Sequence, residues 1–312
     1  HPCYTESMNH FLFTYLDAYQ MQLIPQQDGT NQDLIQFFHL SKRKATQYNL
    51  PSQYKAKQLI TIVFPLENHM FLSTKDSVSI VYEDEILLVA NKPPFLLVHD
   101  DGNHTDSLQD RVNAYLYNCG WPHKAQACHR IDFETSGLVL FCKNPFFQGM
   151  LNHLFMSSNI QKQYRCLVKG SFPSHIKKAD FSIGRNRHTN AMIVNPHGKE
   201  AHTLFHVVQA TQTLSFLHVT LLTGRKHQIR VHCAYLSHPI LNDPIYGQKE
   251  DDQGLMLQNY QMKCVHPLTQ EHLMFSLPIE SRFEQAWYKR VHTHATKQPN
   301  ILDLNKLEKE SF

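Results

Sequence analysis

The residue types that could do chemistry are concentrated in residues 128–137, whose sequence is CHRIDFETSG. Arg130 and Asp132 are two residues apart, so an extended backbone would point both side chains to the same side. A carboxylate in that position could act as a nucleophile or as a base. The apolar residues 138–141 follow at once and predict a buried strand that holds the polar turn. The structural alternative is that Asp132 and Thr135 only accept hydrogen bonds from the backbone of the turn.

Positive charge is concentrated in a second stretch, residues 223–232, whose sequence is TGRKHQIRVH. Arg225, Lys226, His227 and Arg230 fall within six residues of it. Gly224 would allow a sharp turn from a strand into a helix, because glycine adopts backbone conformations that other residues avoid. Cations and helix N-termini both bind phosphate groups. This stretch therefore predicts contacts with phosphates.

The elements that would position these two stretches alternate between strand and helix patterns. Strands are predicted at residues 78–82, 86–90, 161–170, 201–209, 213–222 and 272–277, and the fourth and fifth of these are expected to pair. Helices are predicted from a Ser107 cap to Tyr117, from Pro145 onward, and over residues 279–290. Residues 177–200 predict a long loop or a hairpin. Periodicity and composition alone indicate only a mixed α and β fold.

The N-terminal part of the chain is less regular. A short helix is predicted around residues 34–38, a basic helix after Ser41, and a strand at residues 58–63. The three consecutive cations Lys42, Arg43 and Lys44 predict either three phosphate contacts or a solvated helix face with no role in binding.

Bulk composition excludes several classes of protein. The 312 residues suffice for one large domain with a small appendage, and the net charge is only +3, so a nucleic-acid surface must come from local clustering. No apolar run approaches the roughly 18 residues needed to span a bilayer. Seven cysteines without a Cys-x-x-Cys pair predict reduced thiols and a cytoplasmic protein.

The 22 histidines raise the alternative of a metal-dependent hydrolase. His202 and His206 are four residues apart, and His292 and His294 are two apart. No His-Glu-x-x-His pattern or comparable set of ligands occurs, so we expect no metal site.

Residues 128–137 resemble the His-Arg-Leu-Asp-x-x-Thr-Ser-Gly signature of the RluA-type pseudouridine synthases, with Ile131 in place of Leu. Further matches are Asn-Lys-Pro at residues 91–93, Lys-x-Tyr-x-x-Leu-Val-x-Gly at 162–170, and residues 198–203, 223–232 and 243–247. Phe95 departs from the pattern, because the family usually has a glycine there.

This resemblance covers residues 77–290 and implies an α+β fold: a long mixed, mostly antiparallel sheet flanked by helices, with a central active-site cleft. We expect residues 1–76 to form an N-terminal region that resembles a degenerate small RNA-binding module. Residues 77–290 would be the catalytic domain, and residues 291–312 a polar tail.

The resemblance also implies roles for individual residues. Asp132 would be the catalytic carboxylate, Tyr164 would stack beneath the flipped base and help to remove the C5 proton, and Ile229 would pack beneath them. An ionised carboxylate in a pocket that excludes water needs a fixed cation, and we expect Arg225 to supply it through two parallel hydrogen bonds. Arg130 would fill the gap left by the base, and the other RNA-binding residues would be His129, Lys226, His227, Gln228, Arg230 and Lys92.

The implied activity is isomerisation of specific uridines to pseudouridine by base flipping, without a metal or an organic cofactor. The partner is RNA, more in keeping with large-subunit ribosomal RNA than with transfer RNA, and the protein is expected to be a monomer. The alternative in another class is an RNA-binding protein that has lost catalysis. Metal analysis and a tritium-release assay on labelled RNA would separate these hypotheses.

Overall fold

A computed structural model describes residues 10–66, 76–100, 102, 106–156, 160–189 and 191–291. The first of these ranges forms an N-terminal unit. Its elements are the strands β1 (Phe11–Leu16), β2 (Gln20–Pro25), β3 (Gly29–Thr30), β4 (Gln53–Tyr54) and β5 (Ile60–Val63), and the helices α1 (Asn31–Phe37) and α2 (Lys42–Gln47). β1, β2 and β5 form an antiparallel three-stranded sheet. Ser41 caps α2 as expected, because its side chain accepts a hydrogen bond from the Lys44 backbone N–H.

The remaining ranges form the larger unit. Its helices are α3 (Leu108–Asn118), the 3₁₀ turn η1 (Pro145–Phe147), α4 (Gln148–Met156), α5 (Gln228–Tyr235) and α6 (Ser281–Val291). Its strands are β6 (Ser79–Glu83), β7 (Leu87–Lys92), β8 (Gln126–Ala127), β9 (Ser136–Cys142), β10 (Gln161–Lys169), β11 (Lys178–Ala179), β12 (Ile183–Arg185), β13 (Met192–Val194), β14 (Thr203–Ala210), β15 (Leu214–Leu221), β16 (Leu257–Val265) and β17 (His272–Ser276).

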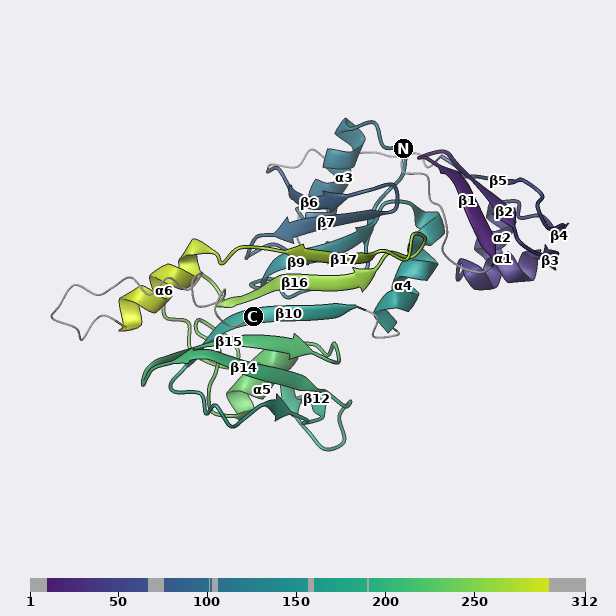
Figure 1. Cartoon of the computed structure of the whole chain (residues 1–312). Helices are drawn as coiled ribbons and strands as arrows, with labels where there is room; N and C mark the ends of the chain where they lie inside the picture. Colours follow the sequence, from purple (N-terminus) through teal and green to yellow (C-terminus); the bar gives the residue numbers. More distant parts are fainter. Residues whose placement is uncertain are drawn as a thin grey trace.

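Within the described residues, one ten-stranded sheet organises this larger unit (Figure 1). Eight of its strands follow the order β11-β14-β15-β10-β16-β9-β7-β6, and β17 and β8 pair with β16 and β9. Every pairing in it is antiparallel except that of β9 with β16. The expectation of a mixed, mostly antiparallel sheet is therefore confirmed.

The two faces of β7 and β9 are covered by different helices because side chains alternate along a strand. On one face, Leu88 and Val139 pack against the buried residues of α3. On the other face, Val89 and Leu140 pack against η1 and α4. Both strands read as continuous apolar runs because both of their faces are buried.

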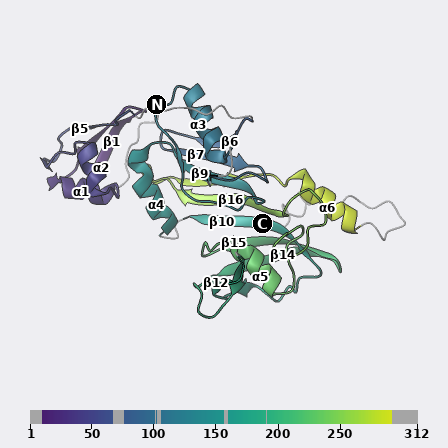
Figure 2. The same ribbon diagram turned by 180° about the vertical axis from the view of Figure 1, so that it is seen from behind.

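The N-terminal unit shares one hydrophobic core with the larger unit. Phe38 contacts Phe146 edge to face, with ring centroids 4.8 Å apart, and Tyr48 packs on Phe146 in the same way at 4.7 Å. Gly149 of α4 lies so close to the backbone carbonyl of His39 that a Cβ atom there would meet it at 2.1 Å. Figures 1 and 2 show α4 between the N-terminal unit and the sheet. The two units are thus packed together by aromatic contacts.

Most expected elements are present, but several strands are additions. The prediction missed the strands β1, β2 and β16 and the two-residue strands β3, β4 and β8, and β16 lies in the middle of the sheet. The expected boundary at residue 76 and the tail beyond Val291 adjoin residues 67–75 and 292–312, which lie outside the described residues. The assignment of residues 1–76 as an RNA-binding module therefore stays a prediction.

Candidate active site

A cavity of about 470 Å³ opens where the middle of the sheet meets the N-terminus of α5. Both stretches singled out in the sequence line it, although roughly a hundred residues separate them. The lining residues are His129, Arg130, Ile131, Asp132, Thr135, Lys162, Tyr164, Leu221, Gly224, Arg225, Lys226, His227, Gln228, Ile229, Arg230 and Leu257.

The loop that carries Asp132 is fixed at its downstream end by the parallel pairing of β9 with β16. Gly137 has φ +115°, and a Cβ atom there would lie 2.2 Å from the carbonyl oxygen of Asn259. Only glycine allows the two strands to approach so closely at this point. The Asn259 side chain donates a hydrogen bond of 2.8 Å to the carbonyl of Leu138, which ties the strands together beside the loop.

Lys92 holds the same loop from the other side. Its side chain is fully buried, and its Nζ donates hydrogen bonds to the carbonyl oxygens of Pro93, Leu96 and Phe133, at 2.9, 2.7 and 3.0 Å. Burial lowers the pKa of Lys92 to about 7, against the charges of Asp132 and Glu134. The assignment of Lys92 to RNA binding was wrong, because the ammonium group faces the protein backbone and not the surface.

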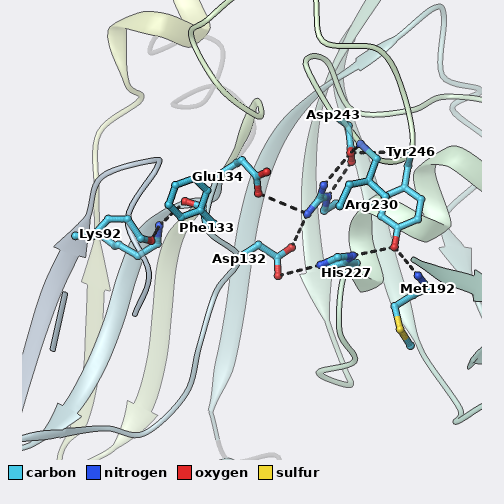
Figure 3. A network of polar contacts seen from close by, with 11 residues as sticks. Lys92, Asp132, Phe133, Glu134, Met192, His227, Arg230, Asp243 and Tyr246 are labelled. Carbon is cyan, nitrogen blue, oxygen red and sulfur yellow. Dashed lines mark hydrogen bonds and ion pairs between the residues drawn. The ribbon is translucent and has the colours of Figure 1, made fainter. Parts of the chain in front are cut away.

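Asp132 is paired with Arg230 (Figure 3). The Arg230 Nη1 donates a hydrogen bond of 3.1 Å to Asp132 Oδ2, while its Nε and Nη2 donate to the two oxygens of the buried Asp243 at 2.9 and 2.8 Å. Burial lowers the pKa of Arg230, but the hydrogen bonds and charges of Asp243 and Asp132 outweigh it and the net shift is upward. A permanently charged, fully buried guanidinium therefore faces the carboxylate.

The expected partner of Asp132, Arg225, does not make this contact. Arg225 is exposed, and its Nε donates a hydrogen bond of 2.8 Å to the carbonyl of Glu200 at the rim of the cavity. The physical reason is the backbone of the turn: His227 has φ +56°, a left-handed conformation, directly before α5. The first turn of the helix then carries Arg230 toward Asp132, while Arg225 remains outside. Gly224, at which we expected the sharp turn, is not among the positive-φ residues of the described chain.

His227 adds a second contact to the carboxylate. Its Nε2 lies 3.7 Å from Asp132 Oδ1, and its Nδ1 lies 2.8 Å from the hydroxyl of Tyr246. That hydroxyl also accepts a hydrogen bond of 2.8 Å from the Met192 backbone N–H of β13 (Figure 3). Burial lowers the pKa of His227, against the charge of Asp132. The neighbouring carboxylate favours the tautomer with hydrogen on Nε2, in which Nδ1 accepts from Tyr246.

Tyr164 and Ile229 form the apolar part of the cavity wall, and both are almost fully buried. Burial, reinforced by the charge of Asp132, raises the pKa of Tyr164 well above its usual range. Tyr164 therefore keeps its phenolic proton at neutral pH, which favours a stacking role over removal of the C5 proton.

The remaining residues assigned to RNA binding divide into two groups. Arg130 and Lys226 are exposed at the cavity and remain available to RNA. The side chain of Gln228, in contrast, is buried. Its Oε1 accepts hydrogen bonds from the Thr223 hydroxyl and the Arg225 backbone N–H. Its Nε2 donates to the carbonyl of His202 and to the hydroxyl of Thr203. In this structure the side chains of Gln228 and Arg230 are buried against protein partners, and their assignment to RNA contact stays a prediction.

His129 also has a protein partner. Its Nε2 accepts a hydrogen bond of 3.2 Å from the Leu140 backbone N–H, and its ring packs on Phe155. Burial, together with the charge of Lys162, lowers the pKa of His129 to about 3. The ring is neutral at physiological pH, and the assignment of His129 to RNA binding stays a prediction.

Among the described residues, no group of three or more His, Cys, Asp or Glu side chains is placed to hold a metal ion. His202 contacts Asp180 at 2.9 Å, whereas His292 and His294 lie outside the described residues. No helix in the described part of the chain is both long and apolar enough to cross a bilayer.

Three residues of the site were missed in the sequence. Asp243 and Tyr246 lie in the segment 243–247, which matched the family pattern without an assigned role. Asp243 accepts from Arg230 and from the backbone N–H groups of Ile245 and Tyr246, so this segment forms a turn around a buried carboxylate. Lys162 lies in the matched pattern around Tyr164, and its cationic side chain was the available signal.

The fold is found in two solved human proteins. RNA pseudouridylate synthase domain containing 4 superposes with a TM-score of 0.57 at 22% identity, over 71% of this chain and 95% of that one. RNA pseudouridylate synthase domain containing 1 gives a TM-score of 0.53 at 24% identity, over 74% of this chain and all of that one. The architecture is thus the pseudouridine-synthase fold, as expected from the sequence.

Sequence comparison gives the family. Residues 86–235 match RNA pseudouridylate synthase. An uncharacterized RNA pseudouridine synthase of Bacillus subtilis is 31% identical over 72% of this chain and 81% of its own length. Ribosomal large subunit pseudouridine synthase D of Zymomonas mobilis is 33% identical over 73% of this chain and 75% of its own. The chain belongs to the RNA pseudouridine synthase family, and within it to the RluA type, and the expected isomerase activity is confirmed at this level.

Proposed function

We propose that this enzyme isomerises uridine to pseudouridine in large-subunit ribosomal RNA, with Asp132 as the catalytic carboxylate. In the reaction the N1–C1′ bond of the nucleotide breaks and a C5–C1′ bond forms. C5 loses a proton and N1 gains one, so the product is an isomer and no external reactant is consumed. The observation that carries the proposal is the Asp132–Arg230 pair at the wall of a cavity large enough for a base.

Asp132 has two possible roles, attack on C1′ or removal of a proton from C2′. Each requires the ionised carboxylate, and Arg230 supplies the opposing charge. Because Asp243 fixes the guanidinium through two further hydrogen bonds, the pair is held in position before substrate arrives.

The target base must leave the RNA helix before it can reach Asp132, which costs a few kcal/mol. Tyr164 would stack beneath the flipped base, and Ile229 would support it from the apolar side of the cavity. Arg130 is exposed two residues before Asp132, so its guanidinium is available to fill the gap in the RNA.

Ribosomal RNA is proposed as the substrate because several of the relatives are named large-subunit pseudouridine synthases, among them synthase D of Vibrio vulnificus and synthase C of Vibrio cholerae. A cytoplasmic location is also proposed, and it is supported by the cysteines of the described residues, all of which are free. We further propose that the enzyme acts as a monomer.

The test uses three transcripts labelled with tritium at C5 of uridine: large-subunit ribosomal RNA, small-subunit ribosomal RNA and a transfer RNA mixture. We expect the enzyme to release tritium only from the first. Release only from transfer RNA would overturn the proposed substrate while retaining the reaction. Absence of release from every RNA, with properly folded protein, would overturn the proposed function itself.

A further inference from the structure

Lys162 shares the cavity with Tyr164 but has no role in the chemistry described above. The two residues are two positions apart on β10, so their side chains project from the same face of the strand. Two positions along a strand span about 6.6 Å. Lys162 therefore lies close enough to Tyr164, the proposed stacking residue, for the sugar-phosphate backbone of the flipped nucleotide to reach both.

The side chain of Lys162 is partly buried, and its ammonium group has no anionic partner in the described part of the chain. Two fully buried lysines, in contrast, have polar partners: Lys92 donates to three carbonyls, and Lys143 pairs with Glu83 at 2.6 Å. For Lys162 the nearest partner found is the ring of Phe155, 5.7 Å from Nζ. Burial lowers the pKa of Lys162, and no opposing charge offsets it.

A cation that is partly removed from water and lacks a counter-charge carries a free-energy cost, which a ligand that supplies the missing charge would offset. In the free enzyme the ammonium group of Lys162 therefore has an unfavourable desolvation energy, which a bound anion would offset. The anion that RNA brings to this cavity is its phosphodiester backbone, which carries one negative charge per nucleotide.

The chain leaves an opening beside this ammonium group at Gly224. A Cβ atom built on Gly224 would find only Lys162 Nζ within 4 Å, at 3.7 Å. Because the φ of Gly224 also lies outside the left-handed region, neither its backbone nor its protein neighbours demand a glycine. The exposed cations Arg225 and Lys226 follow directly. The small residue thus leaves a space open beside Lys162, next to two residues of the chain that carry further positive charge.

We propose that Lys162 Nζ and the open turn at Gly224 form a subsite for a phosphodiester of the RNA, at the flipped uridine or the nucleotide next to it. The subsite rests on the proposed function, since it places the phosphate relative to a base stacked on Tyr164. It adds a contact to the bound nucleotide and takes no part in bond making or breaking.

The test compares Lys162→Met and Gly224→Ala with wild type. Lys162→Met keeps the length of the side chain and removes its charge, and Gly224→Ala places a methyl group in the opening. Lys263→Met is the matched control: Lys263 pairs with Gln161 on the neighbouring strand β16, so it removes one charge from the opposite face of the sheet.

RNA affinity is measured by filter retention between 50 and 200 mM salt, with thermal stability and single-turnover isomerisation measured alongside. We expect Lys162→Met to weaken binding about tenfold and to reduce the salt slope by about one contact. Its turnover at saturating RNA should change much less, and the free protein should be no less stable than wild type. Gly224→Ala should weaken binding without changing stability, and Lys263→Met should bind more nearly as wild type does.

Wild-type affinity and salt slope in a folded Lys162→Met variant would overturn the subsite. If Lys162→Met does not fold, Gly224→Ala decides alone: weaker binding supports the subsite, and wild-type binding overturns it. These affinities are measured against a wild-type enzyme that has been shown to isomerise uridine. A result that overturns the subsite can therefore be distinguished from one that overturns the proposed function.

Discussion

Asp132 and Arg230 lie 98 positions apart in the chain, and a hydrogen bond of 3.1 Å joins Nη1 of the arginine to Oδ2 of the aspartate. The same guanidinium is held by the buried Asp243, so its orientation does not depend on Asp132 or on substrate. Glu134 approaches the guanidinium as well, at 3.9 Å. One arginine thus holds the proposed catalytic carboxylate in position and balances its charge.

Arg230→Lys is predicted to lower turnover by at least about two orders of magnitude, the range found when a positioned electrostatic group is lost. A lysine cannot reach Asp132 and both oxygens of Asp243 at once, because it lacks the planar fork of donors. Arg225→Lys should affect turnover much less, since Arg225 contacts the carbonyl of Glu200 and not the carboxylate. Single-turnover tritium release measures both variants. Equal losses in the two would contradict the assignment of Arg230.

The sequence predicted that these two arginines share one site, but not which of them contacts Asp132. The residue types and spacing placed both stretches at one site, and the need for a cation beside Asp132 followed from the chemistry. Which arginine meets Asp132 depends on the left-handed backbone at His227. Histidine adopts that conformation more often than most residues, but too rarely for the sequence alone to predict it at this position. The Lys92 assignment failed for a similar reason, because the sequence does not show that the ammonium group is fully buried.

The missed central strand has a related cause. β16 carries Gln258, Asn259 and Gln261 in buried positions, which breaks the apolar pattern by which buried strands are recognised. Asn259 is polar because its side chain donates a hydrogen bond to Leu138 of β9, beside the loop that carries Asp132. The parallel pairing of β9 with β16 therefore requires amide side chains in buried positions. Strands and helices with regular apolar spacing, such as β7, β10 and α3, were predicted because their packing follows local pattern alone.

His227→Asn and Tyr246→Phe are predicted to lower turnover about tenfold each, with little change in RNA affinity. Asparagine tolerates the left-handed conformation, so the first variant removes the ring without straining the turn. The second removes the hydroxyl that links His227 to Met192 of β13. Because the two side chains act through one contact to Asp132, the double variant should lose less than the product of the single losses. Fully multiplicative losses would contradict a shared role.

Acid stability offers a test of the neutral His129. Its pKa is lowered to about 3 in the folded protein, whereas the unfolded chain takes up the proton near the ordinary value of about 6.5. Between these values the unfolded state binds one more proton. Stability is therefore fully present above pH about 6.5 and falls as the pH falls, by about 1.4 kcal/mol per pH unit for this residue.

His129→Gln, which can still accept the hydrogen bond from Leu140 N–H, should remove that share of the pH dependence. Urea unfolding at several pH values between 6.5 and 5 measures the slope in both proteins. An unchanged slope in the variant would show that His129 is not the residue responsible.

The N-terminal basic helix is now expected to give two phosphate contacts and not three. Lys44 Nζ donates a hydrogen bond of 2.7 Å to the carbonyl of Pro145 and so faces the larger unit, while Lys42 and Arg43 are exposed. Replacing Lys42 and Arg43 by Ala should weaken RNA binding, reduce the salt slope by about two contacts and leave the modified uridine unchanged. Lys44→Met should instead lower thermal stability. A salt slope equal to that of wild type in the double variant would remove this helix from the RNA interface.

The central claim is that Asp132 carries the chemistry, and Asp132→Asn tests it most directly. Asparagine has nearly the same size and serves turns as well as aspartate does, but it lacks the charge and the reactive oxygen. We measure isomerisation by tritium release and binding by filter retention on one ribosomal RNA fragment, with thermal unfolding as the control for folding. We predict that isomerisation vanishes while RNA affinity stays close to wild type, because that affinity comes mainly from phosphate and stacking contacts. Retained isomerisation in the folded Asp132→Asn variant would contradict it.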